Sequence, residues 1–283
     1  MIKTYYQLAK PGIIYGNALM AIGGFFLAAQ GHFKPGLFLA MLLGICLVMA
    51  SGCVFNNYID RGIDSKMLRT KKRASVTGLI SPRNQLIYGT VLGLIGFLSL
   101  AFTNLITVLI ALAGWFFYVI LYGIAKRRSV HGTIVGSIAG AVPPVVGYTA
   151  ITGHLDGAAW LLFFILVLWQ MPHFYAIAIF RSDDYDAAGL PVLPVKHGVH
   201  ITKVQIVIYI LALMVALALL NILGYAGYTY LVAMILLNFR WLWLAIRGFT
   251  AQNDLVWARQ VFRFSLVLIT ALCIILSLNS LVP

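Results

Sequence analysis

Long, nearly unbroken apolar runs of about twenty residues recur along the whole chain and alternate with short polar segments. A transmembrane helix needs about 20 consecutive apolar residues, whereas the strands of a membrane barrel would show short segments of alternating polarity. The pattern therefore predicts an all-α, polytopic membrane protein whose helices surround a central cavity, with one domain over residues 1–283. The nine predicted spans are 13–30, 37–58, 84–103, 105–125, 133–152, 158–179, 203–222, 226–247 and 262–281.

The composition excludes a soluble domain and a secreted disulfide scaffold. Of the 283 residues 62% are hydrophobic and 10% are charged, and the mean hydropathy is +0.96. Soluble domains carry roughly 25% charged residues. Cys46, Cys53 and Cys273 lie inside apolar runs, where we expect neither a disulfide nor a zinc site.

The net charge of +13 comes from Lys and Arg residues that lie mostly on one side of the predicted membrane. This is not the pattern of a nucleic-acid-binding protein. Nineteen of the 20 Lys and Arg residues lie at the N-terminus, on alternate connections or on the adjoining helix ends, and Lys34 alone lies on the opposite side. Lys and Arg collect on the cytoplasmic side of membrane proteins. The distribution therefore predicts a cytoplasmic N-terminus, a C-terminus on the outer side and no nucleic-acid partner.

The acidic residues form two clusters on the predicted cytoplasmic side. All seven are Asp, and five of them follow the second or the sixth predicted span: Asp60, Asp64, Asp183, Asp184 and Asp186. A random scatter of solvated side chains would not concentrate them at the ends of two spans. The clusters are therefore candidates for a functional site.

In the first cluster Asn56, Asp60 and Asp64 are four residues apart. A helix that continues through this segment places an amide and two carboxylates on one face. Like charges at this spacing repel unless a cation lies between them. Mg²⁺ prefers oxygen ligands and is commonly held by one or two carboxylates together with substrate phosphates. The spacing thus favours a magnesium–diphosphate site over an ordinary solvated helix end.

Basic residues directly follow the predicted helix that ends at Asp64, and Arg181 lies beside the second acidic cluster. Taken alone they would be read as determinants of membrane topology, but beside the carboxylates they are suited to binding phosphate oxygens. The candidate diphosphate-binding residues are Arg61, Lys66, Arg69, Lys71, Lys72, Arg73, Arg181 and Tyr185.

Polar residues interrupt the sixth predicted span. Pro172 removes a backbone hydrogen bond and predicts a kink. Gln170 and His173 are costly in lipid and are expected to face the protein interior. Three roles remain open for His173: a structural hydrogen-bond donor, a metal or haem-iron ligand, or an acid/base.

These segments carry a resemblance to a known family. Asn56-Asn57-x-x-Asp60-x-x-x-Asp64 resembles the first aspartate-rich motif of the intramembrane UbiA-type prenyltransferase superfamily. Further stretches resemble the haem O synthase (protoheme IX farnesyltransferase) branch of that superfamily, namely 10–12, 50–57, 78–82, 143–148, 169–173 and 184–194.

One departure concerns the second motif of the superfamily, which is often Asp-x-x-x-Asp. The positions four residues after Asp183 and Asp184 are alanines. Which of Asp183, Asp184 and Asp186 contacts metal is therefore open, and the neighbouring Tyr185 favours Asp184.

The resemblance implies transfer of the farnesyl group of farnesyl diphosphate to a vinyl group of haem b, with addition of water, to give haem O for terminal oxidase assembly. It implies Mg²⁺ as cofactor, with Asp60, Asp64 and Asp184 as ligands and Asn56 in the same catalytic set. His173 and Gln170 would contact haem. The expected location is the bacterial inner (plasma) membrane, with the lipid bilayer and haem-processing or oxidase assembly proteins as partners.

Two alternatives remain at this point. One is a prenyltransferase of the same superfamily that acts on an aromatic quinone precursor, which the stretch at 169–173 disfavours. The other is a non-enzymatic haem-handling or transport protein. Transport carboxylates tend to lie near mid-membrane within internally repeated halves, whereas these lie at helix ends.

Overall fold

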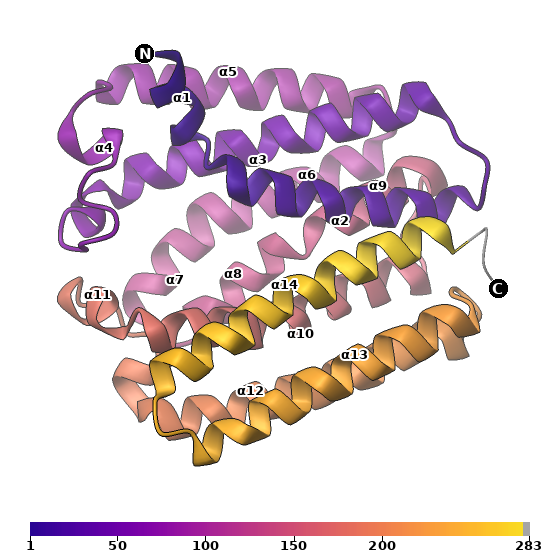
Figure 1. The fold of residues 1–283 in the computed structure, drawn as a ribbon. Helices are drawn as coiled ribbons and strands as arrows, with labels where there is room; N and C mark the ends of the chain where they lie inside the picture. Colours follow the sequence, from indigo (N-terminus) through magenta and orange to yellow (C-terminus); the bar gives the residue numbers. More distant parts are fainter. Residues whose placement is uncertain (280–283) are drawn as a thin grey trace.

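The computed structural model describes residues 1–279 as a bundle of long helices (Figure 1). The described residues contain nine helical segments long and apolar enough to cross a membrane, and no strand. The predicted fold class is therefore confirmed. The spans are α2 (Pro11–Ala29), α3 (Pro35–Asp64), α5 (Pro82–Ala101), α6–η1–α7 (Leu105–Arg128), α8–α9 (Gly132–Thr152), α10 (Gly157–Phe180), α12 (Leu193–Ile222), α13 with η2 (Tyr228–Thr250) and α14 (Asp254–Leu278).

Several segments are subdivided or short. A π-helical turn separates α6 from α7, and a break at Ala141 separates α8 from α9. The bounds are α1 (Ile2–Leu8), α4 (Ala74–Thr77), α6 (Leu105–Phe116), η1 (Phe117–Leu121), α7 (Tyr122–Arg128), α8 (Gly132–Gly140), α9 (Val142–Thr152), α11 (Ser182–Ala187) and η2 (Arg247–Thr250).

Each predicted span overlaps one observed span, but two helices extend well beyond a predicted end. α3 continues to Asp64 and α14 begins at Asp254. The first residues of α12, from Leu193, are divided from its membrane-spanning part by a non-helical backbone at Gly198, with φ 83°. Hydropathy detects the lipid-compatible part of a helix, while backbone hydrogen bonding continues into the polar boundary. The end of the predicted span 262–281 lies outside the described residues. The extension of α3 matters most, because it carries both carboxylates of the first cluster on one continuous helix.

Local sequence explains where the spans begin. Proline occupies the first turn of α2, α3 and α5, where its missing N–H breaks no helical bond. Side-chain oxygens accept hydrogen bonds from first-turn N–H groups at four other positions, which satisfies otherwise unpaired donors. These N-capping residues are Ser81, Asn104, Asp156 and Asn253.

The helices lie in neighbouring groups, with α10 near the centre. In Figure 1, α2, α3 and α5 lie together at the top and α12 and α13 at the bottom, with α14 running between them. α10 packs against α8, α9, α12 and α14, and the hydrophobic windows of α10 and α8–α9 are 67% and 61% buried, more than those of the other spans. α10 is thus surrounded by protein, which allows it to carry polar side chains.

Two glycines allow the backbones of α2 and α9 to touch. A Cβ at Gly24 would collide with the carbonyl group of Pro144, and a Cβ at Gly147 would collide with the carbonyl group of Ala21. Small residues at such crossings permit close approach and van der Waals packing of membrane helices. The α2–α9 pair is therefore interlocked by its backbone.

We expect Gly147→Ala to lower the midpoint of thermal unfolding in detergent. The new methyl group meets a backbone carbonyl, which cannot rotate away, and overpacking of this kind costs about 1–3 kcal/mol. Gly36→Ala is the matched control, because Gly36 is exposed in the first turn of α3 and a Cβ there meets nothing within 4 Å. Equal midpoints for the two variants would contradict the interlocked packing.

Candidate functional site

A cavity of about 880 Å³ lies within the bundle. Residues from α2, α3, α6, η1, α7, α8, α10 and α14 line it. Along α10 the lining extends from Leu166 to Arg181, which corresponds to about 22 Å at 1.5 Å per residue. The cavity is therefore long enough to connect the polar end of the bundle with the middle of α10.

Asp60 and Asp64 line this cavity although both are buried, with exposed fractions of 8% and 3%. Asp60 forms ion pairs with Lys126 and with Arg127, whose Nη2 lies 3.3 Å from Oδ1. Asp64 forms an ion pair with Arg73 at 2.6 Å. Buried charges are tolerated when they are paired and hydrogen-bonded, so each carboxylate is matched by a cation from another segment.

Asn56 and Asn57 precede the carboxylates on α3 and are also buried. Asn57 accepts a hydrogen bond from Arg73 at 3.3 Å and donates to the carbonyl of Leu8 at 2.8 Å. Asn56 Oδ1 accepts from Lys10 at 3.1 Å, and its Nδ2 has no hydrogen-bond partner among residues 1–279. Because Asn56 lines the cavity, this amide group is a donor suited to an anionic ligand.

The second acidic segment, α11, is connected to the loop after α3. The backbone N–H of Leu68 donates to Asp184 Oδ1 at 2.9 Å. Tyr185 packs with Met67 and lines the cavity, and burial raises the pKa of its phenol. Asp183 and Asp186 are exposed. The two acidic segments therefore meet at one end of the bundle, and Asp184 is the carboxylate that joins them.

The predicted basic residues divide into two groups. Arg69, Arg73, Arg181 and the phenol of Tyr185 line the cavity. The others are exposed and lie outside its lining: Arg61, Lys66, Lys71 and Lys72. Arg61 instead stacks over the ring of Tyr58, with 4.4 Å from its guanidinium carbon to the ring centre.

Lys10 and Lys126 line the cavity but were not predicted as site residues. Lys10 lies between α1 and α2 in a left-handed backbone conformation with φ 55°, and its ammonium reaches Asn56. Burial lowers the pKa of Lys10 to about 8. The sequence carries one signal for these two residues, because each is a basic residue directly beside an apolar run. Lys10 also belongs to a stretch that carries the family resemblance, and Lys126 to the basic residues that predict membrane topology.

Of the predicted metal ligands, Asp60 and Asp64 line the cavity, whereas Asp184 is not part of its lining. Within residues 1–279 no group of three or more His, Cys, Asp or Glu side chains is arranged to hold a metal ion. Asp60 and Asp64, one helical turn apart in the cavity wall, form a two-carboxylate set. Such a set fits Mg²⁺, which commonly completes its coordination with substrate phosphate oxygens and water.

Gln170 and His173 lie on the cavity side of α10, as expected for polar residues in a membrane span. The helix is continuous through Pro172. Gln170 is buried and donates to the carbonyls of Ser137 at 3.1 Å and Leu166 at 2.9 Å. His173 bonds through Nδ1 to Ser265 Oγ on α14 at 2.7 Å. The imidazole is thus bonded to a side chain of another helix.

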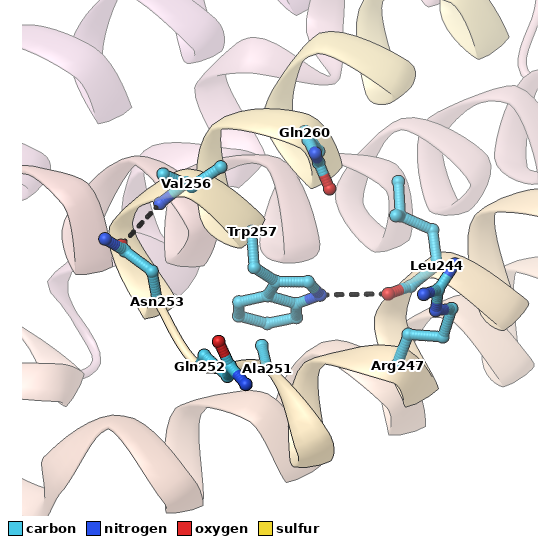
Figure 2. A pocket seen from close by; sticks show the side chains of 8 residues that line it. All are labelled: Leu244, Arg247, Ala251, Gln252, Asn253, Val256, Trp257 and Gln260. Carbon is cyan, nitrogen blue, oxygen red and sulfur yellow. Dashed lines mark hydrogen bonds between the residues drawn. The ribbon is translucent and has the colours of Figure 1, made fainter.

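Another pocket, of about 320 Å³, lies where α13 and η2 turn into α14 (Figure 2). Trp257 points into it and donates to the Leu244 carbonyl at 2.9 Å, while Asn253 caps α14. Its lining contains Arg247 and amide side chains but no carboxylate, Cys or His. The paired carboxylates and the imidazole make the larger cavity the candidate active site.

The chain is similar to known proteins along nearly its whole length. The model of the UbiA prenyltransferase family matches residues 17–278. A protoheme IX farnesyltransferase of Yersinia pseudotuberculosis serotype O:1b (strain IP 31758) is 53% identical over 281 residues, which cover 99% of this chain and 95% of that protein. One from Cronobacter sakazakii (strain ATCC BAA-894) is 52% identical over 285 residues, covering 100% and 97%.

Solved structures share the fold at lower identity. A digeranylgeranylglyceryl phosphate synthase superposes with a TM-score of 0.81 at 17% identity, over 99% of this chain and 98% of that one. A UbiA homologue from Archaeoglobus fulgidus bound to GPP and Mg²⁺ gives a TM-score of 0.68 at 17% identity, over 96% and 99%. The family match, the relatives and the shared fold agree, and the chain belongs to the UbiA prenyltransferase family.

Proposed function

We propose that this membrane prenyltransferase transfers the farnesyl group of farnesyl diphosphate to a vinyl group of haem b, with addition of water, to give haem O. The observation that carries the proposal is the near full-length identity of 53% to a protein named protoheme IX farnesyltransferase. The cavity supports it, because one continuous space joins paired carboxylates and cations to an imidazole and aromatic side chains.

The diphosphate binds at the charged end of the cavity. Lys10, Arg73 and Lys126 present cationic groups there, with Arg69, Arg181 and Tyr185 at the same lining, and the free Nδ2 of Asn56 adds a neutral donor. Arg61, Lys66, Lys71 and Lys72, which are exposed, act through the longer-range positive potential that attracts the anion.

Asp60 and Asp64 would hold Mg²⁺, which when bound would supply charge neutralisation for the departing diphosphate. Asp184, the third predicted ligand, lies outside the cavity lining and accepts a hydrogen bond from the backbone N–H of Leu68. The chain's own contribution is to keep both carboxylates buried in the cavity wall and paired with cations. Their cationic partners Lys126 and Arg73 lie on the same wall, so they are placed to contact diphosphate oxygens as well.

The apolar tail and the reacting carbon lie against aromatic side chains. Trp115, Tyr118 and Tyr122 line the cavity, and the two tyrosine rings stack with centroids 5.9 Å apart. Aromatic faces attract cations, so they stabilise the allylic cation that develops as the C–O bond breaks. The same apolar walls keep bulk water away from that cation.

The acceptor requires no base to become nucleophilic, because a vinyl group is already an electron-rich alkene. Its terminal carbon forms a bond to farnesyl C1 while the C1–O bond breaks and diphosphate leaves. The cation left beside the porphyrin then takes up water, which becomes the hydroxyl group and releases one proton. His173 and Gln170 provide the polar patch beside which the porphyrin lies.

The nine apolar helical segments of the described chain indicate a multi-pass membrane protein. We place it in the bacterial inner membrane, and the sided distribution of Lys and Arg supports a cytoplasmic N-terminus and an outer C-terminus there. The diphosphate site would then face the cytoplasm. The farnesyl chain of its haem product would hold that product in the membrane, where haem-processing or oxidase assembly proteins would receive it.

The direct test supplies purified protein with haem b, farnesyl diphosphate and Mg²⁺ and measures the product by mass spectrometry. We expect a haem adduct heavier by one farnesyl group and one hydroxyl group, because both add across the vinyl double bond and haem loses no atom. A parallel reaction replaces haem b with a hydroxybenzoate. Prenylated hydroxybenzoate without haem O would contradict the proposed acceptor.

We expect Asp60→Asn and Asp64→Asn each to lower turnover by about 100-fold or more, because each removes a carboxylate ligand of the Mg²⁺ that would neutralise the leaving group. Asp186→Asn, an exposed carboxylate outside the cavity lining, should retain turnover. Size-exclusion profiles and haem binding check that the variants are folded. Wild-type turnover in both cavity variants would contradict the assignment of the diphosphate site.

Lys10 gives the reaction a pH dependence with a defined sign. Its ammonium is charged below the pKa of about 8, so electrostatic attraction for diphosphate is present below that pH and lost above it. We expect kcat/KM for farnesyl diphosphate, which reports the free enzyme, to fall above about pH 8 in the wild type. Lys10→Arg should stay active to higher pH, and an unchanged profile in that variant would exclude Lys10 as the titrating group.

A further inference from the structure

We infer that Ser265 on α14 is a positioning residue that determines which ring nitrogen of His173 carries the proton. It holds the proton on Nδ1 and leaves Nε2 as a lone-pair donor facing the cavity, where it can ligate the iron of a porphyrin substrate. The identity of that ligand rests on the proposed function, whereas the protonation pattern rests on hydrogen bonds alone.

The hydroxyl group of Ser265 has one hydrogen and two neighbours. Its Oγ lies 2.6 Å from the carbonyl oxygen of Phe262 and 2.7 Å from Nδ1 of His173. A carbonyl oxygen can only accept, so the hydroxyl hydrogen is directed to Phe262. Oγ must then accept at its second contact, and Nδ1 of His173 is the donor. In a neutral imidazole the other nitrogen, Nε2, is then the acceptor.

The ring is also fixed in orientation. Trp169 stacks on His173 with ring centres 4.8 Å apart and an interplanar angle of 27°, and Phe262 lies against it at 4.9 Å. The indole N–H of Trp169 donates to the backbone carbonyl of Ser265 at 3.0 Å. Ser265 therefore holds both the imidazole and the indole that stacks on it, and α10 and α14 are joined at this point.

The imidazole that carries Nε2 borders the cavity. His173 is half-buried and lines the cavity, whereas Ser265 is fully buried and does not. Nε2 makes no hydrogen bond with any residue in the described part of the chain. A histidine that ligates a metal donates its other ring N–H to a fixed acceptor, which sets the tautomer and the ring orientation. Ser265 occupies the position of that acceptor.

Ligation through Nε2 would place the porphyrin at a fixed distance from the diphosphate site. His173 precedes Arg181, which lines the charged end of the cavity, by eight residues. The separation is about 12 Å along α10 at 1.5 Å per residue. This spacing leaves room for one edge of the porphyrin between the iron ligand and the leaving group, so that a vinyl group can reach farnesyl C1.

The first test requires no haem. Protein labelled with ¹⁵N-histidine gives ring nitrogen shifts that distinguish a protonated from a bare nitrogen, and His173→Ala identifies the signals of His173. We expect protonated Nδ1 and bare Nε2 in the wild type. Ser265→Thr, which keeps the hydroxyl group, should preserve this pattern, and Ser265→Ala should lose it. Bare Nδ1 with protonated Nε2 in the wild type would overturn the inference.

The second test is an absorbance titration with haem b. We expect the wild type to give the Soret band of histidine-ligated haem, His173→Ala to lose it, and Ser265→Ala to bind about 10–100-fold more weakly, as for other acceptors behind a ligating histidine. Farnesyl diphosphate binding should be unchanged in each. Ser277→Ala is the matched control, since Ser277 on α14 also bonds a carbonyl of its own helix, that of Cys273 at 2.7 Å, and lies outside the cavity lining.

The outcomes separate this inference from the proposed function. Wild-type haem affinity and spectrum in Ser265→Ala would overturn the positioning role even if haem O is formed. A wild type with the expected protonation pattern that binds no haem would overturn the ligand role and the proposed acceptor together, while the control of the tautomer by Ser265 would stand.

Discussion

A carboxylate that is buried at a membrane boundary needs a cationic partner. This requirement determines the arrangement of one end of the molecule. Asp60 and Asp64 are buried on α3, and their partners come from α7 and from the loop that precedes α4. Removing one member of a buried ion pair leaves an uncompensated charge, which is strongly destabilising. The pairs therefore fix α7 and the loop against α3, and the cavity mouth takes its shape from them.

The same pairing explains how a site for a highly charged substrate can exist beside lipid. Lys126, Arg127 and Arg73 compensate the carboxylates within the folded chain, so the site is stable without an ion or a substrate. An incoming magnesium–diphosphate unit brings both signs of charge. The metal can take the place of a cation beside the carboxylates, and the diphosphate can take the place of a carboxylate beside the cations. Because the two charges enter together, little net charge is buried.

Much of the fold could be predicted because lipid imposes a simple rule on sequence. Backbone groups in the membrane must be satisfied within a helix, so each apolar run became a span, and the four-residue spacing of Asn56, Asp60 and Asp64 predicted one face of α3. The partners of these residues could not be predicted. Lys126 follows Asp60 by 66 residues and Ser265 follows His173 by 92, and hydropathy carries no information about which helices become neighbours.

The backbone of Lys10 has a consequence for the evolution of the chain. A non-glycine residue in the left-handed region costs about 1–2 kcal/mol, and Lys10 has φ 55°. Glycine at this position would relieve that cost but would remove the ammonium group that reaches Asn56. Selection for stability alone would therefore favour losing the lysine, whereas selection for activity would retain it. Position 10 is a site at which engineering for thermostability would be expected to reduce catalysis.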